Sequence, residues 1–293
     1  MTGGCTLCPR RCGADREEHM GYCGAGKLPH VAKVMLHTWE EPCISGVNGT
    51  GAIFFCGCNL HCVFCQNHAI NHTMAGERMD AAALAQTMLT LQSQGAHTID
   101  LVTPTPHVDV LLPAIARARR AGLTIPIAYN TNAYETLETI NRLNGFIDIY
   151  LPDFKYVTPA TAQRYSGCGD YFAFAAPAIK AMHAQVGSLC VGSDGIAGRG
   201  MIVRHLVLPG AVSETRRVLE HMAATLPQTT HISLMGQYVP MDKAALYPPL
   251  DRKLLRREYA RAVDYCLALG FTNVYIQSLD AADASFTPVF AAQ

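Results

Sequence analysis

The chain has 293 residues, in which 23 Lys and Arg are balanced by 23 Asp and Glu. This length is enough to bury a large core in one α/β domain. The balanced charge excludes the basic excess that nucleic-acid-binding proteins use, so we expect no nucleic-acid partner. The first residues lack the apolar core of a signal peptide, and no apolar run is long enough to span a bilayer. We therefore expect a cytoplasmic protein with no membrane partner.

Cysteines crowd the beginning of the chain, where nine of the twelve lie within the first 65 residues. In a reducing compartment such crowding favours metal binding over disulfides. The first four have the spacing Cys5-x2-Cys8-x3-Cys12-x10-Cys23. Four thiolates are enough for a closed site that holds either zinc or a [4Fe–4S] cluster, and Cys43 could replace one of them. We expect residues 1–50 to form a cysteine-rich metal-binding extension with little periodic structure.

Beyond residue 50, short apolar runs alternate with longer segments of helical period. The apolar runs predict strands over residues 52–56, 98–102, 124–129, 147–151, 201–208, 231–235 and 273–277. The periodic segments predict helices over residues 81–94 (capped by Asp80), 108–121, 134–143, 159–186 (broken near Gly167), 213–226 (capped by Ser213) and 254–269. Repeated β-then-α units imply a parallel sheet. About six such units predict an α/β fold, a partial (β/α)6-type TIM barrel over residues 51–293.

The first predicted strand leads directly into a second cysteine motif, Cys58-x3-Cys62-x2-Cys65. Thiolates are the soft ligands that hold iron–sulfur clusters. Three ligands on a four-iron cube leave one iron open to a substrate or cofactor. In barrels of this kind the chemistry gathers at the carboxyl ends of the strands, where this motif lies. We interpret Cys56 as a non-ligand, and a zinc loop lacking one ligand is the alternative for the motif.

The spacing of these three cysteines resembles the cluster motif of the radical S-adenosylmethionine (SAM) enzymes. With CTLCPRRCGADR, HTWEEPCISG, GCNLHCVFCQN and YLPDFKY, the chain is similar to uncharacterised proteins related to pyruvate formate-lyase activating enzymes. The resemblance implies that SAM chelates the open iron and is cleaved reductively to a 5′-deoxyadenosyl radical. It also implies that Phe64 lies near the adenine of SAM. A flavodoxin- or ferredoxin-type partner would supply the electron.

The resemblance also implies roles for polar residues at the later strand ends. Those expected to bind the cofactor are Asn130, Asn132, Asp153, Lys155 and Arg204. Arg204 would pair its planar guanidinium with the SAM carboxylate. The residues expected to face the substrate are Gln237 and Tyr238.

Two segments differ from the pattern or lie outside it. The activating enzymes usually carry a Gly-Gly-Glu motif after the second strand, which helps to hold the amino group of SAM. This chain has Val-Thr-Pro-Thr-Pro over residues 102–106, in which Thr103 and Thr105 are candidate substitutes. Glu40 and Glu41, before the first predicted strand, are interpreted as anchors of the extension to the barrel rim.

These observations predict a radical SAM enzyme that abstracts a hydrogen atom. The resemblance favours one that generates a glycyl radical on a partner protein. An enzyme that modifies another peptide or a small metabolite is the nearest alternative. A non-catalytic zinc or iron–sulfur binding module is the alternative from another class.

Overall fold

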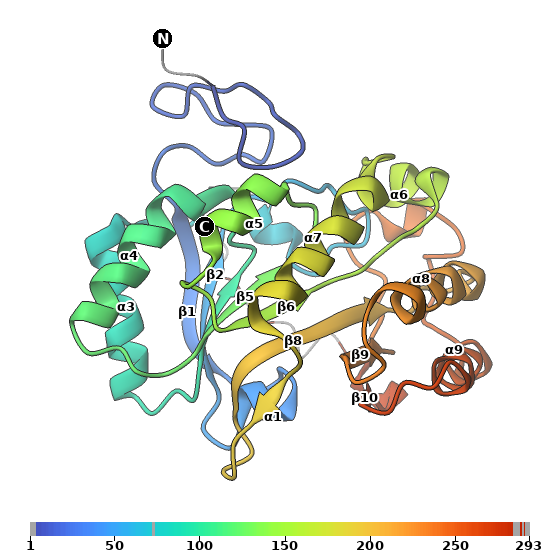
Figure 1. The fold of residues 1–293 in the computed structure, drawn as a ribbon. Helices are drawn as coiled ribbons and strands as arrows, with labels where there is room; N and C mark the ends of the chain where they lie inside the picture. Colours follow the sequence, from blue (N-terminus) through green and yellow to red (C-terminus); the bar gives the residue numbers. More distant parts are fainter. Residues whose placement is uncertain (1–3, 72–73, 284–287, 289, 291–293) are drawn as a thin grey trace.

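The computed structural model describes residues 4–71, 74–283, 288 and 290 (Figure 1). Most of its strands form one sheet, with the order β10-β9-β8-β6-β5-β4-β2-β1-β3. The strands are β1 (His30–His37), β2 (Thr50–Phe55), β3 (Glu77–Arg78), β4 (Ile99–Val102), β5 (Ile127–Thr131), β6 (Ile149–Pro152), β7 (Cys190–Val191), β8 (Ala197–Leu206), β9 (His231–Met235) and β10 (Val274–Ile276). The short strand β7 pairs with β8 beside this path.

From β2 through β4, β5, β6, β8 and β9 to β10, every neighbouring pair of strands is parallel. The strand β1 runs antiparallel to β2, and β3 runs antiparallel to β1. The ends of the sheet, β3 and β10, do not pair with each other, so the sheet remains open. This confirms the predicted partial (β/α) barrel.

Helices connect the parallel strands, as each crossover requires. They are α1 (Pro42–Ser45), α2 (His68–Asn71), α3 (Ala81–Ser93), α4 (Val108–Arg120), α5 (Leu137–Leu143), α6 (Pro159–Ser166), α7 (Tyr171–Val186), α8 (Val212–Thr225) and α9 (Arg256–Ala268). Figure 1 shows α3 and α4 near one end of the sheet and α8 and α9 near the other, with α5 and α7 between them. None of the helices in the described part of the chain is both long and apolar enough to cross a membrane.

Helix ends follow the local sequence, with two differences from the prediction. Asp80 caps α3 by accepting hydrogen bonds from two backbone amides at 2.8 and 2.9 Å. Gly167 ends α6 in the left-handed region, at φ 64°, which explains the predicted break. The helix predicted from residue 134 begins only at Leu137, because Thr136 caps it. Ser213 is not a cap, since α8 already begins at Val212.

The sequence did not predict β1, which extends the open sheet beside β2, or α1, which packs on its inner face. The strand β1 pairs along the whole of β2. In α1, Cys43 and Ile44 pack against Ala128, Leu151 and Ile202, which lie on β5, β6 and β8. Neighbouring residues of the same strands pack in the separate core under the outer helices, so the two sets lie on opposite faces of the sheet. The helix α1 therefore fills part of the concave face.

The cysteine-rich residues 4–29 form loops without a helix or strand, at the top of Figure 1. They pack on the segment that follows β2. The backbone N–H of Cys58 donates to the carbonyl oxygen of Cys23 at 3.1 Å. The rings of Tyr22 and His61 stack, with centroids 4.5 Å apart. The extension is therefore attached to the loop that carries the second cysteine motif.

Candidate active site

A cavity of about 430 Å³ lies at the carboxyl ends of the parallel strands. Apart from Thr105, its wall contains the residues predicted to bind the cofactor or face the substrate: Cys58, Cys62, Phe64, Cys65, Thr103, Asn130, Asn132, Asp153, Lys155, Arg204, Gln237 and Tyr238. These residues come from elements spread over most of the chain. The structure thus gathers them at one place, as expected for the carboxyl edge of a parallel sheet.

Each thiol of the second cysteine motif has a polar neighbour. The contacts are Asn132 Nδ2 to Cys58 Sγ (3.3 Å), Ser166 Oγ to Cys62 Sγ (3.0 Å) and Asn71 Nδ2 to Cys65 Sγ (3.2 Å). Hydrogen bonds to cysteine sulfur are among the features that tune the potential of an iron–sulfur cluster. A set of three thiols with polar support at a cavity wall fits a cluster with one open iron.

Burial dominates the acid–base properties of the three thiols. It raises the pKa of Cys58 and Cys62 above the ordinary value and that of Cys65 to about 12. The thiols are therefore protonated at neutral pH when no metal is bound. Since metal ligands must be thiolates, cluster assembly at these residues must release protons.

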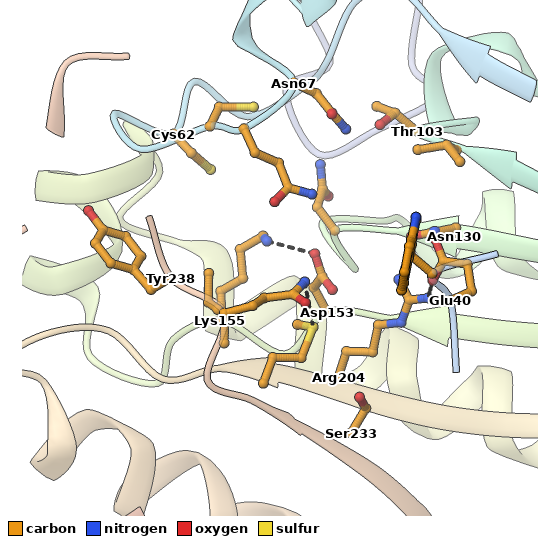
Figure 2. Close-up of a pocket in the computed structure, with 18 of the residues that line it drawn as sticks. Glu40, Cys62, Asn67, Thr103, Asn130, Asp153, Lys155, Arg204, Ser233 and Tyr238 are labelled. Atoms are coloured by element: carbon orange, nitrogen blue, oxygen red, sulfur yellow. Dashed lines mark hydrogen bonds and ion pairs between the residues drawn. The ribbon is translucent and has the colours of Figure 1, made fainter. Parts of the chain in front are cut away.

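Lys155 and Asp153 form an ion pair in the middle of the cavity. The Nζ–Oδ2 distance is 2.7 Å, and the side chains are 18% and 24% exposed. Burial lowers the pKa of Lys155, but the charge of Asp153 and its hydrogen bond outweigh this effect, so the pKa lies above its ordinary value. Figure 2 shows this pair between Cys62 and Tyr238 on one side and Thr103, Asn130 and Glu40 on the other. A permanent cation thus faces the cavity.

Arg204 is more deeply buried than this ion pair, and its guanidinium is bound by protein carboxylates. Its Nε and Nη2 donate to the two oxygens of Glu41 at 3.1 and 3.0 Å. Nη2 also binds Glu40, and Nη1 donates to Asn130 Oδ1 at 3.3 Å. Glu40 and Glu41 thus anchor their segment to β8. Pairing of Arg204 with the SAM carboxylate remains a prediction, for which only one Nη1 hydrogen is left.

Asp100 is a buried carboxylate beside this network that sequence analysis missed. Its Oδ2 accepts from Asn130 Nδ2 at 3.2 Å, while its Oδ1 has no hydrogen-bond partner. Burial and then the charge of Glu40 raise the pKa of Asp100 well above its ordinary value, against the opposing effect of Arg204. The only sequence signal was an acidic residue inside an apolar strand.

Thr103 occupies the strand end where the activating enzymes carry Gly-Gly-Glu. Its φ of 61° is unusual for a β-branched residue, and its backbone N–H donates to Asn130 O at 3.0 Å. The structure therefore holds Thr103 at the cavity wall in a strained conformation. Thr105 does not join it, because its hydroxyl donates to the buried Glu135 at 2.5 Å.

Comparison with known proteins decides the family. Residues 52–200, half of the chain, match the family model of the radical SAM superfamily. The chain belongs to this superfamily. Its members use a [4Fe–4S] cluster and SAM, and the donor set described above fits both.

Two similar proteins, one of them known in two crystal structures, illustrate the relationship. An uncharacterized protein of Methanocaldococcus jannaschii, MJ0674, is 29% identical over 280 residues, which cover 92% of this chain and 76% of that protein. The crystal structure of Streptococcus suis SuiB bound to its precursor peptide SuiA has a TM-score of 0.53 and 13% identity, over 77% of this chain and 48% of SuiB. SuiB bound to S-adenosylmethionine gives a TM-score of 0.52 and 14% identity, over 77% and 49%. The chain spans about half the length of SuiB, and the likeness concerns the fold alone.

In this radical SAM protein the two predicted substrate-facing residues have partners of their own. The hydroxyl of Tyr238 donates to Leu250 O at 2.6 Å, and its ring contacts Phe64 edge to face at 5.9 Å. The side chain of Gln237 accepts from Gln277 at 2.9 Å. Tyr238 therefore offers the cavity its ring and not its hydroxyl.

The remaining cysteines of the first 65 residues divide into two groups. Cys5, Cys8, Cys12 and Cys23 lie outside the cavity wall, in the extension. In contrast, the thiol of Cys43 accepts from Tyr275 at 3.3 Å in the barrel interior, and that of Cys56 donates to a backbone carbonyl. In the described residues, no three His, Cys, Asp or Glu side chains are gathered closely enough for a single metal ion.

Sequence reasoning missed the residues that contact the cysteine sulfurs from outside the motif. Asn71 follows the motif closely, so its proximity to Cys65 was a signal that could have been used. Ser166 comes from the end of α6, and no local pattern connects it with Cys62. Asn59, within the motif, accepts from Asn132 Nδ2 at 2.8 Å. Such contacts depend on the folded arrangement of distant elements.

Proposed function

We propose that Cys58, Cys62 and Cys65 hold a [4Fe–4S] cluster and that the adjoining cavity binds SAM. The cluster supplies an electron that cleaves SAM to a 5′-deoxyadenosyl radical. The observation that carries this proposal is the meeting of the three thiols and the strand-end polar residues in one cavity. The protein's own contribution is to bind and orient SAM and to exclude water.

The residues of the cavity suggest how SAM would be held. Lys155, at its centre, is paired with a single carboxylate, that of Asp153, whereas Arg204 is paired with two glutamates. We therefore infer that Lys155 neutralises the SAM carboxylate. Phe64 would contact the adenine, and Asn130 and Asn132 the ribose and methionine moieties. Thr103 would contact the amino group, and Tyr238 would contact the substrate through its ring.

The reaction we propose is abstraction of a hydrogen atom from a backbone glycine of a partner protein, as in an activating enzyme. The motif resemblance supports it, and modification of another peptide or a small metabolite is the competing reaction. We propose a flavodoxin- or ferredoxin-type reductant, a cytoplasmic location, and a second metal site at the four cysteines of the extension.

The first test is anaerobic cleavage of SAM by reconstituted protein with dithionite. Wild-type protein should form 5′-deoxyadenosine, and the Cys58→Ala, Cys62→Ala, Cys65→Ala triple variant should form none. The matched control is Cys56→Ala, which removes a nearby thiol that binds only a backbone carbonyl and should keep the activity. Failure of fully loaded wild-type protein to bind SAM in a titration would refute the proposal.

A second test concerns Lys155. Its charge-assisted contact should be worth enough that Lys155→Met weakens SAM binding about tenfold or more. Lys180→Met is the control, because Lys180 is exposed on α7. For the activating role, a glycyl radical enzyme labelled with deuterium at its glycine Cα should transfer deuterium to 5′-deoxyadenosine. Transfer from a labelled small metabolite instead would favour the competing reaction.

A further inference from the structure

Three cysteines of the extension, Cys5, Cys12 and Cys23, lie around Gly21 and Arg16, and Cys8 lies within electrostatic range of Cys23. A Cβ atom on Gly21 would lie 3.3 Å from Cys12 Sγ and 3.6 Å from Cys23 Sγ, so the missing side chain leaves space between these two thiols. The thiol of Cys5 lies beside that of Cys12. The Nη2 of Arg16 donates to Cys23 Sγ at 3.2 Å. The positively charged guanidinium of Arg16 thus lies beside the thiols of the extension.

The backbone closes the loop around these cysteines. The N–H of Cys5 donates to Ala14 O at 3.0 Å, and that of Gly13 donates back to Cys5 O at 3.1 Å. Cys12 is exposed, whereas Cys23 is buried against the barrel. The loop therefore presents Cys12 to solvent and Cys23 to the protein interior.

Two connections lead from this loop to Cys58. The first is the hydrogen bond from the backbone N–H of Cys58 to Cys23 O, at 3.1 Å. The second runs through side chains: Asn59 lies beside the thiol of Cys8, and Asn132 donates both to Asn59 Oδ1 at 2.8 Å and to Cys58 Sγ at 3.3 Å. The first connection joins the backbones of Cys23 and Cys58, and the second leads from the side of Cys8 to the sulfur of Cys58.

Arg10 holds the extension in this position. Its Nε donates to Asn59 O at 3.0 Å, and its Nη2 donates to Gly167 O at 2.9 Å. The guanidinium lies 4.3 Å from the ring centroid of Tyr22 and 5.3 Å from that of Tyr134. Because Arg10 stands between Cys8 and Cys12 in sequence, the loop that carries the thiols is fixed directly on the cluster loop.

We propose that Cys5, Cys8, Cys12 and Cys23 hold a second iron–sulfur cluster, and that Cys23, Asn59 and Asn132 form the path by which it passes electrons to the site at Cys58. Its position favours a cluster over zinc: the loop with the four thiols contacts the cluster loop at Cys58 and Asn59, where a redox centre can pass on an electron and a zinc ion cannot. The electron path rests on the proposed function, whereas the second cluster does not.

The proposed transfer involves one electron. A reduced flavodoxin- or ferredoxin-type protein is oxidised by one electron, and the cluster of the extension is reduced by one. The same electron then passes to the site at Cys58, which is reduced by one while the extension returns to its oxidised state. No bond forms or breaks within the protein.

The first experiment measures iron, sulfide and electron paramagnetic resonance of the reconstituted full chain. Wild-type protein should bind about eight irons, and about four should remain in each of two variants, one lacking the four cysteines of the extension and the other the three of the cavity. In reduced wild-type protein the two signals should broaden each other. About four irons with bound zinc in wild-type protein, or two signals that simply add, would overturn the proposal.

The second experiment compares two reductants. The variant lacking the four cysteines should keep cleaving SAM with dithionite, but lose about tenfold or more with reduced flavodoxin. Asn59→Ala, which keeps all seven ligands, should bind about eight irons and show the same selective loss. Asn141→Ala on α5 is the control, since Asn141 is exposed. Equal rates with flavodoxin in Asn59→Ala and wild type would overturn the path.

The outcomes separate this inference from the proposed function. If wild-type protein binds the second cluster but never cleaves SAM with dithionite, the proposed function fails and the second cluster stands. If SAM is cleaved but the iron count stays at about four, the proposed function stands and the second cluster is refuted. Thermal unfolding of each variant shows whether the extension remains folded.

Discussion

Replacing Arg204 with methionine would leave two carboxylates at the inner end of the cavity without their cation. Glu41 binds the guanidinium through both oxygens, and Glu40 binds it through one. The side chains of Arg204 and Glu41 are only 8% and 7% exposed, so water cannot replace the lost contacts. Breaking a buried ion pair by removing one partner typically costs about 3–5 kcal/mol, because it leaves an uncompensated charge.

We expect Arg204→Met to lower the free energy of unfolding by about 4 kcal/mol, within that range, because Glu40 keeps some access to solvent. The measurement is urea unfolding of the cofactor-free protein followed by circular dichroism. Arg142→Met is the matched control, since its ion pair with Asp109 is 39% and 59% exposed and should contribute about 1 kcal/mol or less. The double variant Arg204→Met, Glu41→Leu should recover part of the loss. A loss below about 1 kcal/mol in Arg204→Met would refute the picture of a buried charge network.

Three further predictions concern the loops around the cavity. Burial raises the pKa of Glu135 to about 7, so the stability that its protonated form contributes is present at low pH and lost as the pH rises through about 7. In urea unfolding, Glu135→Gln should flatten this decline of the free energy of unfolding with pH. An unchanged pH dependence would contradict the prediction. Gly57 has φ 85°, and an added Cβ would lie 2.6 Å from Cys23 O. Gly57→Ala should therefore lower the free energy of unfolding by about 2 kcal/mol or more and lower the iron content. Iron binding equal to that of wild type would argue against the docking of the extension on the cluster loop. Thr103→Gly should relieve backbone strain, so the free energy of unfolding should stay equal or rise by up to about 1 kcal/mol. The same variant should bind SAM more weakly in a titration. A large loss of stability would show that side-chain packing outweighs the strain.

The parallel strands could be predicted because their signal is local. Fully buried runs such as β2 and β4 are continuously apolar, and turns or helix caps bound them. The strand β1 was missed because most of it is only half-buried, and its partner follows after α1. The start of α5 was misplaced because a turn precedes Thr136, which the helical period of the sequence does not show.

The candidate site was predictable to the extent that it depends on strand ends. The residues after parallel strands meet at one edge of the sheet, so Asp153 and Asn132 could be placed near Cys58 without a structure. The partners of Arg204 could not, because they depend on how the segment with Glu40 folds back across the sheet. Long-range packing of this kind leaves no periodic pattern of residues in the sequence.

The helix α1 also bears on how short a functional form of this protein can be. It precedes the region matched by the family model, yet Cys43 and Ile44 pack inside the barrel, and Glu41 at its start binds Arg204. A truncated protein that begins at β2 would lose the inner wall of its cavity and expose the interior side of β5, β6 and β8. The minimal catalytic unit therefore starts no later than β1, and truncations for crystallography or assay should preserve residues 30–50.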